Sequence, residues 1–159
     1  MTEAVVMVQH MPPSFTRALA QRLNENSPLA VREAADGDRL ERGVALLAPG
    51  NYHLQLDSHN RVALDQGPRR NGVRPALDVS METAVTQYGA ATIGVVLTGM
   101  GTDGTSGSRH IKAAGGQIIA EDQATSTVYG MPRSVIEAGL ADHIVPLPQV
   151  ASKIRELIE

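Results

Sequence analysis

The segment Ile93-Gly94-Val95-Val96-Leu97-Thr98-Gly99-Met100-Gly101-Thr102-Asp103-Gly104 joins a short apolar run to a loop that contains three glycines. The first five residues lack the alternation of a half-exposed strand, so they predict a strand covered on both faces, as in a parallel sheet. A helix through residues 111–114 is expected next, and it should end at Gly115-Gly116. This order of strand, loop and helix is typical of α/β proteins.

The pattern extends to both sides of this segment. Residues 53–57 and 61–65 alternate polar and apolar side chains and predict an antiparallel hairpin. A second strand covered on both faces is predicted at 4–8, and further strands are predicted at 29–34, 44–48, 117–120 and 143–145. Helices are predicted after a Ser14 cap, from Pro75 with Leu77, Met81, Ala84, Val85 and Tyr88 as the buried stripe, over 133–138 and over 148–158. We therefore expect an α/β, three-layer doubly wound sandwich with a mostly parallel sheet and one antiparallel hairpin.

The composition limits the classes of function. The chain has 159 residues, of which 42% are hydrophobic, and this predicts a single domain over 1–159. It has no cysteine, so disulfides and thiolate metal sites are excluded, and a reducing cytoplasm is the expected compartment. A net charge of −3 with 3% aromatic residues does not favour nucleic-acid binding. No apolar run predicts membrane insertion, no histidine grouping predicts a metal site, and no cofactor is expected.

Two strand ends carry the candidate chemistry. The first strand is followed by Gln9-His10-Met11-Pro12-Pro13, and the strand at 93–97 is followed by the loop that holds Asp103. If the strands are parallel, both tips lie at the sheet edge where ligands gather, and His10 could meet Asp103. A carboxylate that orients an imidazole makes a general base, as in Ser-His-Asp hydrolases. Alternatively, His10 packs in the interior and Asp103 caps the following helix.

A second interpretation uses the same glycines. Gly99-x-Gly101-x-x-Gly104 matches a dinucleotide-binding pattern, and Glu121 and Asp122 stand near the place of a ribose-binding acid. Against it, Asp103 would put a carboxylate where a pyrophosphate approaches the helix amides. The glycines could instead let backbone amides approach an oxyanion. No serine is a good nucleophile candidate, because Gly104-Thr105-Ser106-Gly107-Ser108 lacks the last glycine of a G-x-S-x-G turn.

Several segments resemble the catalytic domain of the chemotaxis protein-glutamate methylesterases. They are Val8-Gln9-His10-Met11-Pro12-Pro13-Ser14-Phe15-Thr16, Ala48-Pro49-Gly50-Asn51-Tyr52-His53, Arg74-Pro75-Ala76-Leu77-Asp78-Val79, the loop Leu97 to Gly104, Ala124-Thr125-Ser126 and Tyr129-Gly130-Met131-Pro132. The resemblance runs from residue 4 to about residue 150. It implies hydrolysis of glutamyl methyl esters, and deamidation of glutamines, on the cytoplasmic helices of methyl-accepting chemotaxis receptors. By position, it assigns the histidine to His10, the aspartate to Asp103 and the oxyanion amide to Met100.

The resemblance also implies a serine that residues 1–159 do not supply. In the family, this nucleophile stands in a G-x-S-x-G-G turn upstream of the histidine strand. We therefore expect a chain that lacks the family's first strand, turn and helix, and also its receiver domain. A companion segment, another subunit of a homo-oligomer or a rearranged core would then cover the gap. The alternative function is a catalytically silent module that binds receptor helices, for instance through Arg69, Arg70 and Arg74, although these could equally form a solvated basic loop.

Overall fold

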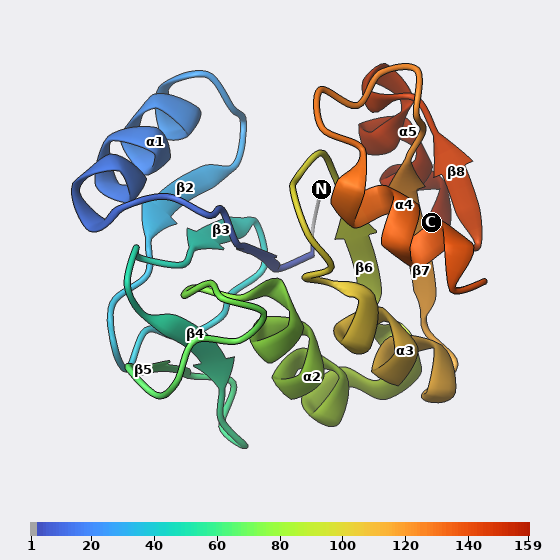
Figure 1. Ribbon diagram of the computed structural model, residues 1–159. Helices are drawn as coiled ribbons and strands as arrows, with labels where there is room; N and C mark the ends of the chain where they lie inside the picture. The colour runs from blue at the N-terminus through green and yellow to red at the C-terminus, as the bar shows by residue number, and fades with distance from the viewer. Residues whose placement is uncertain (1–2) are drawn as a thin grey trace. The chain divides into compact units, whose positions relative to one another are not determined.

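The computed structural model describes residues 3–159, which fall into two compact units (Figure 1). Unit 1 ends at Thr83 and unit 2 begins at Ala84. Helix α2 (Leu77–Tyr88) therefore begins in unit 1 and ends in unit 2. Each unit contains a three-stranded parallel sheet with helices packed on it.

The sheet of unit 1 has the order β1-β3-β2, and all its strands are parallel. Its strands are β1 (Val5–Met7), β2 (Ala30–Glu33) and β3 (Val44–Leu47). The central strand β3 is the most buried of the three, and its Leu46 and Leu47 are at most 1% exposed. Helix α1 (Pro13–Glu25) packs on this sheet by placing Ala20 against Val31 and Leu47. The β1–α1–β2 order thus brings the end of β1 next to the start of α1.

The predicted hairpin completes unit 1. Strands β4 (His53–Leu56) and β5 (Val62–Asp65) pair antiparallel. The first half of α2 is fastened to β4, because the Ser80 hydroxyl donates to the Leu54 carbonyl at 2.7 Å and the Leu56 amide donates to Thr83 Oγ1 at 3.0 Å.

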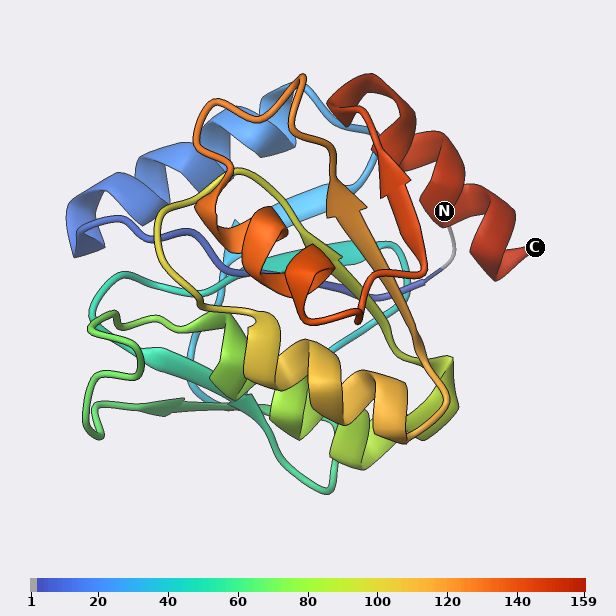
Figure 2. The same ribbon diagram turned by 45° about the vertical axis from the view of Figure 1, so that its right-hand side comes forward.

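The sheet of unit 2 has the order β6-β7-β8 and is also parallel. Its strands are β6 (Ile93–Val96), β7 (Gln117–Glu121) and β8 (His143–Val145), and its helices are α3 (Thr105–Ala113), α4 (Gly130–Glu137) and α5 (Leu147–Ile158), with the short 3-10 helix η1 (Gly89–Ala91) before β6. Residues 118–121 of β7 are at most 1% exposed, as expected for a strand covered on both faces. Helix α5 lies along one side of these strands, and α3 and α4 lie along the other (Figure 2).

The structure confirms the α/β class, the predominance of parallel pairing and the single antiparallel hairpin. It places the parallel strands in two three-stranded sheets, one in each unit. The prediction that Ser14 caps helix α1 is wrong, because Pro12 is its N-cap residue and Pro13 is its first residue. Helix α2 begins at Leu77 and not at Pro75, which follows a cis peptide bond. Met81 and Val85 are buried as predicted, whereas Tyr88 stays 38% exposed. Over residues 3–159, no helix is both long and apolar enough to cross a bilayer.

Candidate active site

His10 lies three residues beyond the end of β1, at the carboxyl edge of the sheet in unit 1. The neighbouring strand β3 ends at the same edge, where the Ala48 amide donates to the Met7 carbonyl at 2.9 Å. Ligands of parallel α/β sheets gather at this edge. The half-buried side chain of His10 is therefore placed where the sequence predicted it.

The loop that follows His10 rests on Gly50. A Cβ atom at this position would overlap the backbone of residues 11–13, so only glycine allows the two segments to approach so closely. The Gly50 amide donates to Thr16 Oγ1 at 3.0 Å, and that fully buried hydroxyl lies 2.7 Å from Glu33 Oε2 and 2.9 Å from the Pro13 carbonyl. One hydroxyl thus joins α1, β2 and the turn after β3 behind the His10 loop.

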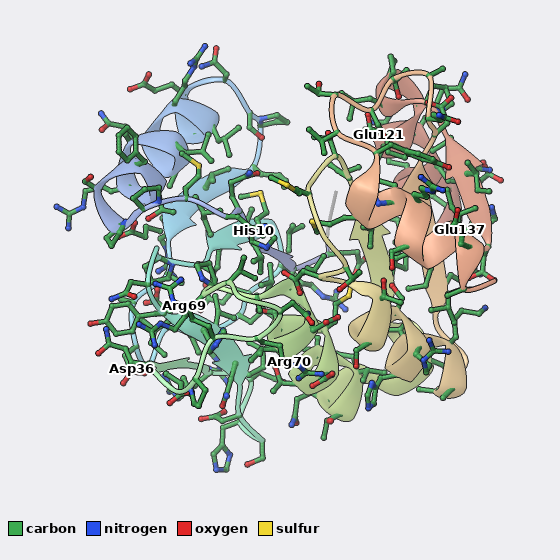
Figure 3. All side chains as sticks on the ribbon, in the orientation of Figure 1. His10, Asp36, Arg69, Arg70, Glu121 and Glu137 are labelled. Carbon is green, nitrogen blue, oxygen red and sulfur yellow. The ribbon has the colours of Figure 1, made fainter. Side chains whose placement is uncertain are left out.

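A pocket of about 430 Å³ opens beside His10. Its polar lining consists of His10, Asn51, Arg69 and Arg74, and its apolar lining consists of residues 11–13 and Val73. Figure 3 labels His10 and Arg69 on this part of unit 1. The lining combines an imidazole, two guanidinium groups and short apolar walls, and it contains no carboxylate.

Two of the three neighbouring arginines are held by the fold. Arg70 makes a bidentate ion pair with Glu82 of α2, with nitrogen to oxygen distances of 2.7 and 2.6 Å. Arg74 donates through Nη2 to Asn51 Oδ1 at 2.6 Å and through Nη1 to the carbonyl oxygens of residues 66 and 67. The exposed Arg69, by contrast, makes no hydrogen bond or ion pair with any of residues 3–159.

Asp103 lies in the loop between β6 and α3, at the carboxyl edge of the sheet in unit 2. Its side chain is only 2% exposed, which is rare for a carboxylate outside a functional or paired setting. The loop turns on Gly101 and Gly104, whose φ angles of 93° and 97° lie in the left-handed region that favours glycine. Gly104 is the N-cap residue of α3, and Asp103 directly precedes it.

The segment before α4 holds the Met100 turn in place. The Gly99 amide donates to the Val128 carbonyl at 2.9 Å, and the Met131 amide donates to the Gly99 carbonyl at 2.8 Å. A Cβ atom at Gly130 would lie 3.1 Å from the Gly101 nitrogen, which is closer than an ordinary van der Waals contact, so the two segments pack tightly here. Met100 itself is 82% exposed, and its amide donates to no acceptor among residues 3–159.

Glu121, at the end of β7, is buried and supports the same loop. Its Oε2 atom accepts the Thr98 amide at 2.8 Å, and its Oε1 atom accepts the Thr125 hydroxyl at 3.1 Å. Asp122 accepts the Thr125 amide at 2.9 Å. The carboxylates that the dinucleotide interpretation assigned to a ribose therefore bind the protein's own backbone, and this structure does not favour that interpretation.

The structure thus places His10 in unit 1 and both Asp103 and Met100 in unit 2, each at the carboxyl edge of its own sheet. The pairing of His10 with Asp103 stays a prediction. Sequence reasoning missed the supporting role of Thr16 and Glu121, because each has a hydrogen-bond partner more than fifteen residues away in the chain. Across residues 3–159, no group of three or more histidine or carboxylate side chains could hold a metal ion.

Comparisons with known proteins agree on one family. The family model described as CheB methylesterase matches residues 1–154. The protein-glutamate methylesterase/protein-glutamine glutaminase of Symbiobacterium thermophilum is 50% identical over 97% of this chain and 42% of its own length, and that of Thermotoga maritima is 46% identical over 97% of this chain and 46% of its own length. The chain therefore spans less than half the length of these relatives. The crystal structure of the Thermotoga maritima CheB methylesterase catalytic domain matches with a TM-score of 0.95 and 46% identity, over 99% of this chain and 85% of that chain.

Proposed function

The chain belongs to the CheB methylesterase family, and from this premise we propose that its two units act as one catalytic domain that hydrolyses glutamyl methyl esters. Chemotaxis receptors are the proposed protein substrates, and their cytoplasmic helices place the reaction in the cytoplasm. The curated relatives also carry the name glutaminase, so deamidation of glutamines on the same helices is part of the proposal. The observation that carries it is the placement of a half-buried histidine and a buried aspartate at the carboxyl edges of two parallel sheets.

In the proposed mechanism, His10 is the general base and Asp103 orients its imidazole. His10 removes the proton of an attacking hydroxyl, whose oxygen then forms a bond to the ester carbonyl carbon. The amide of Met100, which donates to no acceptor among residues 3–159, stabilises the negative charge on the carbonyl oxygen. When the intermediate collapses, the carbon to methoxy bond breaks and His10 protonates the leaving group, which departs as methanol. A water molecule then hydrolyses the acyl intermediate by the same proton transfers, and a glutamate carboxylate is the product.

The attacking hydroxyl is not assigned to any of the 159 residues, because none of their serines stands in a G-x-S-x-G turn. A second candidate function is a silent module that holds receptor helices, for instance through Arg69, Arg70 and Arg74, without cleaving the ester. The two candidates differ in turnover, whereas both predict binding to methylated helices.

Methanol release from a methylated receptor tests the proposal. Replacing a general base lowers such rates by about 10² to 10⁴-fold, so His10→Ala should do so here. His59→Ala is the matched control, because that exposed histidine lies in the turn between β4 and β5. Equal rates for His10→Ala and the wild-type protein would exclude His10 as the base. Binding to the receptor without any methanol release would favour the silent module.

The pairing of His10 with Asp103 has a separate readout. An imidazole N–H that donates to a buried carboxylate gives a strongly downfield proton resonance in nuclear magnetic resonance spectra. We expect this resonance in the wild-type protein and its loss in both His10→Ala and Asp103→Asn. A resonance that persists in Asp103→Asn would show that another group orients His10.

A further inference from the structure

We propose that the pocket beside His10 is a carboxylate site in which Arg69 binds a glutamate that neighbours the methyl ester on the substrate helix. This inference rests on the proposed function, since it names a second recognition element of the same substrate. It assigns the site a ligand class, a peptide carboxylate, and one residue that selects it.

The charge of the pocket favours an anion. Two arginines line it, no carboxylate lines it, and the rest of the lining is neutral or histidine. The protein as a whole carries a net charge of −3, so this positive concavity differs from the average surface. Oppositely charged groups attract most strongly where surrounding protein excludes part of the solvent.

The three arginines near the pocket do not share the same role. Arg70 is neutralised by Glu82 through two short hydrogen bonds, so its charge is already matched. Arg74 uses both terminal nitrogens on protein oxygens, which fixes it as part of the wall. None of those three acceptors is a carboxylate, so Arg74 still contributes its positive charge to the pocket. Its Nε atom is buried and has no hydrogen-bond partner among residues 3–159.

Arg69 is the arginine that remains available. It is exposed, it lines the pocket, and within residues 3–159 it has no hydrogen-bond or ion-pair partner. A guanidinium group presents a planar fork of donors that matches the two oxygens of a carboxylate. The wall at residues 11–13 is apolar and suits the methylene groups of a glutamate side chain.

The geometry of a helix connects this site to the ester. Side chains three or four residues apart on a helix lie about 5–6 Å from one another at Cβ, on the same face. A helix that presents a methyl ester to His10 can therefore present a glutamate one turn away to the same pocket. Since His10 and Arg69 both line that pocket, one helical face can occupy both.

Binding of two synthetic helical peptides to the whole protein tests the site without requiring turnover. Both peptides carry a glutamyl methyl ester, and the residue four positions away is glutamate in one peptide and glutamine in the other. We expect the wild-type protein to bind the glutamate peptide about tenfold more tightly, as measured by fluorescence anisotropy at low salt. Arg69→Gln should abolish this preference, and Arg69→Lys should retain only part of it.

Arg42→Gln is the matched control, because this exposed arginine precedes β3 and so lies at the opposite end of the parallel sheet from His10. It should keep the full preference. A preference that survives in Arg69→Gln, or that falls equally in Arg42→Gln, would overturn the assignment. Because the readout is binding, an Arg69-dependent preference without methanol release would retain the carboxylate site and remove the esterase proposal. Methanol release without this preference would retain the esterase proposal and remove the carboxylate site.

Discussion

Replacing Thr16 with valine should destabilise the protein, although the two side chains have nearly the same shape. The Thr16 hydroxyl is fully buried, accepts the Gly50 amide at 3.0 Å and lies 2.7 Å from Glu33 Oε2. Valine fills the same space and leaves no cavity, so the change isolates the loss of these hydrogen bonds. It removes the contact that holds the turn after β3 against the start of α1, directly behind His10.

The magnitude follows from the groups that lose a partner. A buried donor left without an acceptor costs about 1–3 kcal/mol, and a hydrogen bond to a charged group contributes about 1.5–3 kcal/mol. The Gly50 amide is buried and bears the full penalty, whereas Glu33 is only partly buried and recovers some hydration. We therefore expect Thr16→Val to lower the free energy of unfolding by about 2–4 kcal/mol.

Urea unfolding followed by circular dichroism measures this loss. With an m-value of about 2 kcal/mol/M, the midpoint should fall by about 1–2 M while the slope stays unchanged. Thr16→Ser keeps the hydroxyl and removes one methyl group, so it should cost about 1 kcal/mol. Thr127→Val is the matched control, because Thr127 is exposed, and it should stay within about 0.5 kcal/mol of the wild type. If Thr16→Val changed the free energy of unfolding as little as Thr127→Val, the Thr16 hydroxyl would not stabilise the turn after β3 against α1.

Three further predictions concern unit 2. Gly104→Ala should cost about 1–2 kcal/mol in urea unfolding, because an alanine is strained at the φ of 97°, and an unchanged midpoint would contradict this reasoning. Glu121→Ala should cost about 2–4 kcal/mol by removing two accepted hydrogen bonds, and the near-isosteric Glu121→Gln should cost less than about 1 kcal/mol; equal costs would argue against a hydrogen-bonding role. Partial burial raises the pKa of Asp142, but the Lys112 ammonium and the Ile118 amide outweigh it and hold this pKa below its usual value. The stabilisation is therefore complete above the ordinary carboxyl pKa of about 3.9 and is lost as pH falls through the lower pKa of the folded state. The difference in free energy of unfolding between the wild type and Asp142→Asn should thus be larger at neutral pH than in acid. A difference that does not depend on pH would contradict this prediction.

The regular elements could be predicted because their signals are local. Short runs rich in apolar residues, unbroken at 4–8 and 93–97, located the six parallel strands, and alternation located the hairpin. The errors fell at helix starts, where proline decides the boundary: Pro12 and Pro13 displaced the expected Ser14 cap, and α2 begins two residues after Pro75. The local sequence predicts that a helix exists more reliably than it predicts the residue at which the helix begins.

The candidate site could be predicted only in part, because its supports are not local. The strand tips revealed His10 and Asp103 as candidates from sequence position alone. By contrast, nothing local distinguished Arg69 from Arg70, since their difference depends on Glu82 twelve residues later in the chain. Likewise, Glu121 looked like a ligand-binding acid until its hydrogen bond to Thr98 showed that it supports a loop.

The unequal anchoring of the three arginines has an evolutionary consequence. Mutations at positions 70 and 74 break contacts within the fold, so selection for stability should constrain them. Arg69 makes no such contact within residues 3–159, so a substitution at this position can change the charge of the pocket without breaking a contact of the fold. If Arg69 forms the proposed carboxylate site, we expect divergence among relatives whose substrates differ in charge pattern to accumulate at this position first.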